Sequence, residues 1–450
     1  MKKYYTLLAL LTISMASFGQ NQVLEAYVAE GIAGNLTLQQ HDFDVKKSQE
    51  RLNQAKALFL PQISFDASYT RAGGGRSIDF PVGDLLNPVY SALNQMSGSE
   101  QFPVIENVNE QFLPNDFHDT KIRLIQPLFN SDIYYASKAQ ERMVSVEEAR
   151  KQTFVNELRY DIQTAYYTHL SALEAVKIFE QSAEVLKELV RVNKSLVAND
   201  KATYDVIYTA EAELSQLQSQ IIGAQKNVRV SQSYFNFLLN RELEAAIEID
   251  EGVKNNRFVF NASGQLSADA FANRQELEQV NRAIDANQYL VKLNKNNAYL
   301  PNMNLVVDAG YQGFGYSFDS NQDYWLAQVS LSWNLFRGGA KKSKIKESEY
   351  ELERLNSQYE QLRDQIQLQV INAYNEYLAA TENVEAARSG ELSAQKSFHI
   401  IDKKYRQSQV ILVEYLDAQN KHRNAQLNRS IAEYNALTKA AELRKVIGNK

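Results

Sequence analysis

The sequence carries two copies of one long pattern, and this repeat constrains the fold more than any other feature. In each copy a Leu-Pro step (Leu60-Pro61, then Leu300-Pro301) precedes a strand-like segment, and a Leu-Phe step (Leu128-Phe129, then Leu335-Phe336) precedes a long helix-like segment. Single residues also recur 208 positions later: Ala165, Tyr166, Leu170, Ala172, Glu174 and Val176 return as Ala373, Tyr374, Leu378, Ala380, Glu382 and Val384. Self-similarity at a fixed period indicates a fold built from two copies of one unit.

The N-terminal segment and the composition restrict the cellular compartment of the protein and the kinds of site that it can contain. Residues 1–19 have the basic start, apolar run and small terminal residues of a secretory signal peptide, with cleavage expected before Gln20. The chain has no cysteine, which excludes disulfides, thiolate metal sites and the lipid anchor of a bacterial lipoprotein. The formal net charge of -6 disfavours a nucleic-acid partner, because phosphate binding requires clustered cations.

Long helices are predicted by the distribution of proline. Six of the seven prolines lie before residue 128, and the seventh, Pro301, separates two proline-free windows, 128–300 and 302–450. The windows predict helices over 131–199 and 338–407, each about 100 Å long at about 1.5 Å per residue. Shorter helices are predicted over 21–57, 202–239, 271–298 and 411–447. Apolar steps of three and four residues, as in Leu352, Leu355, Tyr359, Leu362 and Ile366, are typical of a coiled coil.

Strands are predicted twice in each copy, over 63–70 and 121–129 and then over 303–310 and 327–335. Three of them have one apolar and one polar face, whereas the segment 121–129 alternates less cleanly. Alternating segments of about ten residues with aromatic ends are typical of a membrane β-barrel with an aqueous lumen. Four strands cannot enclose a lumen, and an open sheet edge cannot face lipid. The chain is therefore expected to form an oligomer, and three copies would supply twelve strands.

The repeat also predicts the domain organisation. We assign residues 20–240 to the first repeat, 241–270 to an irregular equatorial linker and 271–450 to the second repeat. The Gly-, Pro- and Asn-rich stretch 71–119 is predicted to be a long loop, and barrel proteins place such loops outside the cell. After the signal peptide, no apolar run approaches the roughly 18 to 20 residues of a membrane helix.

At this level of detail the chain resembles the TolC-type outer-membrane efflux and secretion channel family. The motifs that carry the resemblance are the two strand-to-helix junctions, Gln126-Pro127-Leu128-Phe129-Asn130 and Asn334-Leu335-Phe336-Arg337-Gly338-Gly339, and the start of the second repeat, Arg274-Gln275-Glu276-Leu277. The resemblance implies a mixed, mainly α fold: a homotrimer with a twelve-stranded barrel, four strands per chain, continued by a long α-helical coiled-coil tunnel.

The resemblance also implies a function and partners. Such a trimer sits in the outer membrane of a Gram-negative bacterium, contacts outer-membrane lipid and extends into the periplasm. It exports small molecules or polypeptides as the exit duct of a tripartite efflux pump or a type I secretion system. Its partners are a periplasmic adaptor (membrane fusion) protein and an inner-membrane pump of the RND or ABC type. No enzymatic activity, cofactor or metal is expected.

The residues implied to be functional lie at two helical turns, 199–205 and 407–414, which correspond to the periplasmic tip. Tyr405 resembles the gate tyrosine of the family, Glu414 and Asp417 its two acidic constriction positions, and Asp205 the acidic partner in the first repeat. Candidate adaptor-docking residues are Asn199, Asp200, Ser408 and Gln409. Val410 stands at the position of a gate arginine, and Ser408 and Asn199 replace turn glycines, so the family's latch cannot simply be carried over.

The same candidate residues also fit simpler structural interpretations, and the chain as a whole fits an alternative function. Glu414 and Asp417 also fit a solvated helix start, where acidic residues favour the helix dipole. Tyr405 is one of 25 tyrosines, most of which must pack in the interior or at interfaces. The alternative function is a non-conducting trimeric coiled-coil stalk or adhesin of the cell envelope, which would show continuous heptads without the duplicated strands.

Overall fold

A computed structural model describes residues 22–250, 252–255, 258, 260 and 263–448. The predicted signal peptide lies outside the described residues. The chain divides into two compact units, and each unit draws on both repeats. We call residues 22–50, 141–287 and 350–448 the helical unit, and residues 51–140 and 288–349 the strand unit.

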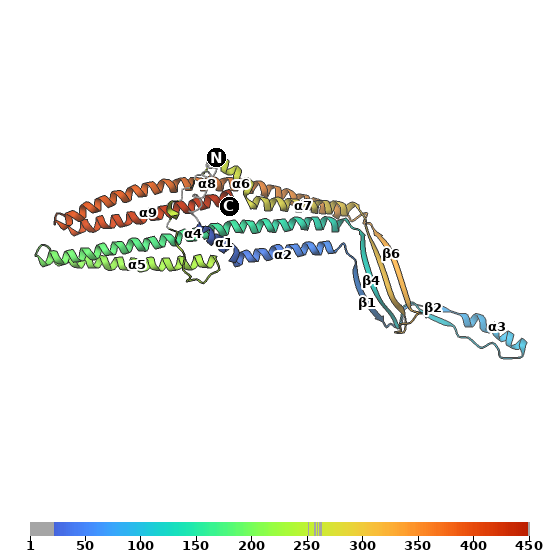
Figure 1. The fold of residues 1–450 in the computed structure, drawn as a ribbon. Helices are drawn as coiled ribbons and strands as arrows, with labels where there is room; N and C mark the ends of the chain where they lie inside the picture. The colour runs from blue at the N-terminus through green and yellow to red at the C-terminus, as the bar shows by residue number, and fades with distance from the viewer. Residues whose placement is uncertain (1–21, 251, 256–257, 259, 261–262, 449–450) are drawn as a thin grey trace, which may run out of the picture. The chain divides into compact units, whose positions relative to one another are not determined.

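Two long helices confirm the prediction from the proline-free windows, namely α4 (Ser131–Ala198) and α8 (Ala340–Arg406). Figure 1 shows that α4 and α8 each run beside the helix that follows them, in two antiparallel hairpins. The remaining helical elements are α1 (Gln22–Gly34), α2 (Leu36–Ala57), α3 (Val82–Ser97), α5 (Asp205–Leu238), η1 (Val253–Asn255), α6 (Ser263–Asn273), α7 (Gln275–Tyr299) and α9 (Leu412–Ile447). None of the described helices has an apolar stretch long enough to cross a membrane.

The helix predicted over 21–57 is interrupted at Asn35, which separates α1 from α2. The Asn35 side-chain oxygen accepts hydrogen bonds from the N–H groups of Thr37 and Leu38, at 3.0 Å each, and so caps the new helix. Its amide nitrogen donates to the Leu238 carbonyl at 3.0 Å, at the end of α5. Asn35 therefore brings the end of α5 to the α1–α2 junction.

The core of the helical unit repeats with the sequence. One cluster packs α1, the end of α5 and part of α9 around α4, and a second packs α6, α7 and the end of α9 around α8. The central residues of the two clusters are 208 positions apart: Leu158, Ile162 and Ala165 in α4, and Ile366, Val370 and Ala373 in α8. The sequence repeat is therefore largely a repeat of the buried positions on which each long helix packs.

The strand unit contains one antiparallel four-stranded sheet in the order β1-β4-β5-β6. The strands are β1 (Gln62–Thr70), β4 (Phe117–Phe129), β5 (Asn302–Phe314) and β6 (Asp323–Ser332). On the polar face Asp66 lies opposite Lys121, and Arg123 makes two 2.8 Å hydrogen bonds to Asp308. The other face exposes apolar side chains, including Ile63, Phe65, Ala67, Trp325, Val329 and Leu331. The predicted two-faced strands are confirmed, and β1 and β6 form the open edges of the sheet.

The prediction of a loop over residues 71–119 was wrong. This segment forms a hairpin of β2 (Ser77–Phe80) and β3 (Val108–Gln111) that encloses helix α3 (Val82–Ser97). Two asparagines of α3 each exchange a pair of hydrogen bonds with an extended backbone: Asn87 with Ile105 at 2.8 and 2.9 Å, and Asn94 with Phe102 at 2.8 and 3.0 Å. The asparagines that suggested a loop hold the returning chain against the helix.

Candidate functional site at the tips of the helical hairpins

The two turns between the paired helices have the same backbone geometry. Asp200 and Ser408 take left-handed φ angles of 58° and 59°. In each turn the N–H after the left-handed residue donates to the carbonyl five residues earlier, Leu196 in the first hairpin and Lys404 in the second, at 2.9 Å. This hydrogen bond is the mark of a Schellman motif, which ends a helix and reverses the chain.

The structure corrects the assignment of the turn glycine position in the first hairpin. Ser408 occupies such a position, as predicted, but in the first turn the left-handed residue is Asp200 and not Asn199. Asn199 instead donates its side-chain amide to the Ser195 carbonyl at 2.7 Å. Asn199, Asp200, Ser408 and Gln409 are all exposed, as a docking surface requires.

Tyr405 lies in the interior of the helical unit, where 5% of its surface is exposed. Its hydroxyl donates to the side-chain oxygen of Asn193 at 2.6 Å, and the amide nitrogen of Asn193, which is fully buried, donates to the Val206 carbonyl at 2.9 Å. Burial raises the pKa of the Tyr405 hydroxyl, so the group remains a donor at neutral pH. These two bonds join α8 to α4 and to the start of α5.

Apolar contacts surround this hydrogen bond. The Tyr405 ring lies 4.9 Å from the Tyr415 ring on α9, and Phe398 packs edge-on against Tyr415 with the ring centres 5.5 Å apart. The cluster draws buried residues from α4, α5, α8 and α9, and Val410 packs against it partly buried. Both hairpins therefore share one core at their tips.

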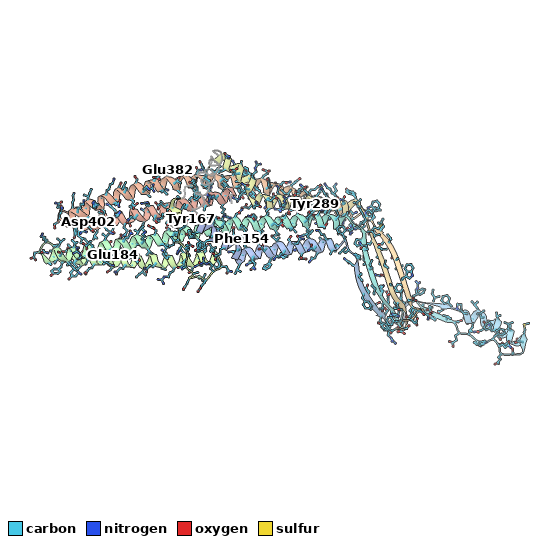
Figure 2. The ribbon with its side chains drawn as sticks, in the orientation of Figure 1. Phe154, Tyr167, Glu184, Tyr289, Glu382 and Asp402 are labelled. Carbon is cyan, nitrogen blue, oxygen red and sulfur yellow. The ribbon has the colours of Figure 1, made fainter. Side chains whose placement is uncertain are left out.

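A second polar link between the hairpins lies at Arg406. Its guanidinium pairs with Asp402 on α8 at 3.1 Å and with Glu188 on α4 at 3.5 Å (Figure 2 shows Asp402 near the turn end of α8). Glu188 also accepts two 2.7 Å hydrogen bonds from Arg191. Arg191 first and Arg406 second lower the pKa of Glu188 to about 2. Arg406, the last residue of α8, thus supplies a cation four residues before Val410, which stands at the position of the family's gate arginine.

The predicted acidic residues occupy three different settings. Asp205 accepts a hydrogen bond from the Thr203 hydroxyl at the start of α5. Glu414 is exposed in the first turn of α9. Asp417 is 58% exposed and pairs with Lys421 one turn later at 2.8 Å. The structure therefore brings Tyr405 into the packed core and leaves Glu414 and Asp417 on the surface of α9.

Comparisons with known proteins agree with this architecture. The profile of the outer membrane efflux protein family matches residues 266–449. Outer membrane protein TolC of Escherichia coli is 23% identical over 479 residues, covering 100% of this chain and 87% of TolC. The alkaline protease secretion protein AprF of Pseudomonas aeruginosa is 23% identical over 338 residues, covering 73% of this chain and 69% of AprF. The solved outer membrane protein VceC of Vibrio cholerae superposes with a TM-score of 0.74 at 16% identity, covering 95% of this chain and 96% of VceC.

The chain is similar over its whole length to the TolC-type outer-membrane efflux family, whose members are channels and not enzymes. Its fold, mainly helical with few strands, is the fold of VceC and of the related solved channels.

Several polar residues of the TolC-type tip were missed by the sequence analysis. Asn193, Gln419 and Arg423 are all buried, and Gln419 donates to the Ser182 hydroxyl at 3.1 Å. Asn193 could have been found from its spacing, because it continues the apolar series of Leu186, Leu189 and Val190 on α4. A polar residue at such a position is a recurrent means of fixing the register of packed helices.

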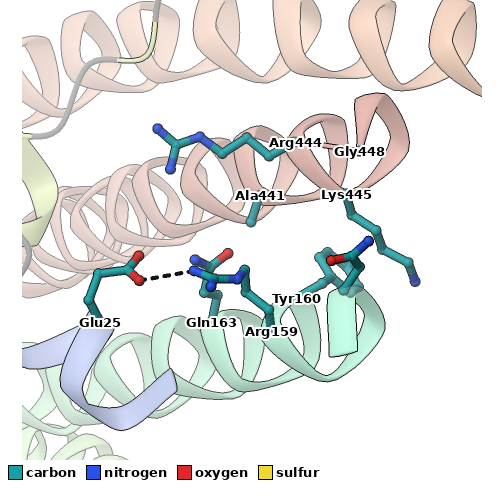
Figure 3. A pocket seen from close by; sticks show the side chains of 9 residues that line it. Glu25, Arg159, Tyr160, Gln163, Ala441, Arg444, Lys445 and Gly448 are labelled. Atoms are coloured by element: carbon teal, nitrogen blue, oxygen red, sulfur yellow. Dashed lines mark hydrogen bonds and ion pairs between the residues drawn. The ribbon is translucent and has the colours of Figure 1, made fainter. Parts of the chain in front are cut away.

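Two cavities among the described residues of the helical unit differ in size and in how open they are to solvent. A polar pocket of about 30 Å³, the size of one or two waters, lies between α1, α4 and α9, where Arg159 pairs with Glu25 at 3.0 Å (Figure 3). A larger open groove of about 950 Å³ is formed by α4, α5 and α9. Among the described residues there is no group of three or more side chains that could hold a metal ion.

Proposed function

We propose that this protein is a homotrimeric outer-membrane channel, the exit duct of a tripartite efflux pump or a type I secretion system. Three copies would form a twelve-stranded barrel and, below it, a coiled-coil tunnel across the periplasm. The repeats over 20–240 and 271–450, joined by 241–270, would each supply two strands and one helical hairpin per chain. The match to the outer membrane efflux protein profile supports the efflux arm of this proposal, and AprF, whose name denotes a protease secretion protein, supports the secretion arm.

The observation that carries the proposal is the open, two-faced sheet. Its apolar face is exposed, with Phe65 69% and Trp325 78% accessible, while its other face holds the Arg123–Asp308 ion pair. Backbone groups at the free edges of β1 and β6 would be unsatisfied in lipid, which costs several kcal/mol per group. Pairing β6 of one copy with β1 of the next removes both edges and encloses the polar face in a lumen.

The tips are proposed to form the periplasmic gate. In a three-fold assembly each exposed carboxylate becomes a ring of three, which concentrates negative potential and attracts cations. Glu414 and Asp417 would form such rings, and Asp205 would add to them from the first hairpin. The Tyr405–Asn193 bond and the Arg406–Glu188 pair would hold the two hairpins of one chain together in the closed state.

The first experiment tests conduction itself. The purified protein should migrate as a heat-modifiable oligomer in detergent and should produce discrete conductance steps in planar bilayers. A non-conducting stalk or adhesin would give the oligomer without conductance, and that result would reject the channel.

The second experiment tests the carboxylate rings. The E414A/D417A variant should lose cation selectivity, measured as the reversal potential in a salt gradient across the bilayer. E180A/E184A is the matched control, because Glu180 and Glu184 are exposed on α4 and Glu184 is paired with a nearby lysine as Asp417 is. Unchanged selectivity in E414A/D417A would sink the ring assignment while leaving the channel intact.

The third experiment tests the polarity of the chain and its adaptor contact. Because the chain has no cysteine, N199C and S408C introduce single reactive thiols at the two turns. Thiol crosslinking in cells should capture a periplasmic adaptor protein from both positions, and the co-purified inner-membrane component would identify an RND or ABC pump. S99C, next to the C-terminal end of α3, is the control; adaptor capture from this position alone would contradict the proposed direction.

A further inference from the structure

The strand unit contains a cationic pocket at the junction where the sheet passes into the helices. The pocket has a volume of about 540 Å³ and is formed by the end of α7, the segment after β6 and the first turns of α8. Five cations line it, against the single carboxylate of Glu349: Lys295, Arg337, Lys341, Lys342 and Lys346. In a chain with a net charge of -6, this concentration of positive charge requires an explanation.

Most of this charge is not neutralised within the strand unit. Lys295 pairs with Glu349 at 2.8 Å, and the Lys341 ammonium donates to the Ala298 carbonyl at 2.9 Å, which fixes α8 to the end of α7. In the described part of the chain no carboxylate lies within ion-pairing distance of the other three cations, Arg337, Lys342 and Lys346. Three cations without a carboxylate partner therefore line a pocket whose walls are held in place by Lys341.

The position of these lysines is unfavourable for the helix itself. The first turn of α8 has no acidic residue, although the partial positive charge of a helix start favours acids and disfavours cations. Apart from Lys341, whose hydrogen bond fixes α8 to α7, the basic residues of this first turn therefore do not serve the stability of α8. This observation makes an external anion the better explanation for them.

Large apolar side chains project beside the cations. Leu335 is 75% exposed, Phe336 84% and Tyr299 71%. The register pairs Asn302 with Ser332, which places the junction at the end of the sheet away from the β2–α3–β3 insertion. An aromatic and aliphatic fringe next to cations at a strand end is the arrangement of a membrane–water boundary.

The first repeat supplies an internal comparison. After the Leu-Phe step, residues 337–346 contain five basic residues and no acidic residue, whereas the equivalent residues 130–139 contain only Asp132 and Lys138. The positions of Lys341 and Lys342 are taken by Tyr134 and Tyr135, whose rings pack against each other 5.1 Å apart. The cationic pocket is thus specific to the second repeat and is not a requirement of the strand-to-helix junction.

We propose that this pocket binds the phosphate headgroup of an anionic phospholipid in the periplasmic leaflet, with Arg337, Lys342 and Lys346 around the phosphate and Leu335 and Phe336 against the acyl chains. The inference rests on the proposed embedding of the strands in the outer membrane. Charge complementarity selects an anionic lipid over a zwitterionic one, and the exposed apolar residues select a lipid over a free anion. With three copies, three such sites would surround the base of the barrel.

The test measures lipid binding to the full-length detergent-solubilised protein by native mass spectrometry, with dioleoylphosphatidylglycerol and dioleoylphosphatidylcholine as probes. K342Q/K346Q should bind phosphatidylglycerol about 30-fold more weakly, since each cation near an anionic lipid contributes about fivefold. K226Q/K396Q removes two exposed lysines from the helical unit and should bind like the wild type. Equal binding of both lipids by the wild type, or wild-type binding by K342Q/K346Q, would overturn the proposal.

Two further measurements separate the alternatives. L335A/F336A should weaken phosphatidylglycerol binding, while L128A/F129A at the first junction should not. If inorganic phosphate displaces the lipid and L335A/F336A has no effect, the pocket is a free-anion site and the lipid assignment is wrong. Conductance recorded on the same proteins keeps the two proposals distinct: a wild type that binds phosphatidylglycerol without conducting would reject the channel and leave the lipid site standing.

Discussion

Replacing Tyr405 with phenylalanine is the sharpest perturbation of the tip. The substitution keeps the ring in the cluster with Tyr415 and removes only the hydroxyl that donates to Asn193 at 2.6 Å. The Asn193 oxygen then remains buried without its donor, which costs about 1–3 kcal/mol of folding free energy. If the bond exists only when the hairpins are together, the equilibrium between closed and open tips shifts toward open by about 5- to 150-fold.

Two measurements follow this change in the purified protein. Thermal unfolding in detergent should shift to lower temperature, and the open probability in planar bilayers should rise. Y208F is the control, because Tyr208 is 67% exposed on α5 and forms no part of the buried cluster. Y208F should leave both quantities unchanged.

A double-variant cycle shows whether the effect comes from the hydrogen bond. N193A alone leaves the Tyr405 hydroxyl without its acceptor and removes the hydrogen bond from the Asn193 amide to the Val206 carbonyl. The Y405F/N193A protein should therefore be less destabilised than the sum of the two single variants, by about 1 kcal/mol. Strict additivity, or a Y405F protein as stable and as closed as the wild type, would refute the reasoning.

Two other predictions concern the turns and the buried histidine. Ser408→Gly should stabilise the protein by about 0.5–1 kcal/mol in a thermal melting assay, because relief of the left-handed φ of Ser408, about 1–2 kcal/mol, exceeds the entropy cost of glycine. Asn199 does not have a left-handed φ, so Asn199→Gly should destabilise the protein in the same assay. Burial lowers the pKa of His169, whose Nδ1 lies 3.0 Å from the Ser231 hydroxyl. The unfolded chain therefore takes up the proton first, and the stability contributed by neutral His169 is present above about pH 6.5 and lost as the pH falls further. Below that pH, the melting temperature of His169→Gln should fall less steeply than that of the wild type. His399→Gln changes an exposed histidine and should keep the wild-type slope. Equal slopes for all three proteins would contradict the role given to His169.

Much of the secondary structure could be predicted because it depends on local periodicity. The spacing of apolar residues and the absence of proline placed α4 and α8 within two residues of their observed ends, and the alternation of side chains identified β1, β5 and β6. The errors arose where one residue type serves two purposes. Asn35 interrupts a predicted helix by capping a new one, and Asn87 and Asn94 hold an ordered segment that their composition suggested was a loop.

The tip residues show the same limit at the level of single side chains. Family resemblance selected Tyr405, but its partner Asn193 lies 212 positions away on another helix. The sequence pattern likewise indicated a tight turn but assigned the turn-glycine position to Asn199, whereas the left-handed residue is Asp200. Such details depend on the rotation of each helix about its axis and on which neighbours that rotation brings into contact.

The sequence by itself therefore determined the duplication, the long helices, the two-faced strands and the place of the two turns between paired helices. Only the tertiary structure decided that Tyr405 is a buried link between hairpins, and that Lys295 on α7 joins the basic residues of α8 in one pocket. The reason is physical: periodicity along a chain encodes which face of an element is apolar, whereas the pairing of polar groups depends on distances between elements far apart in sequence.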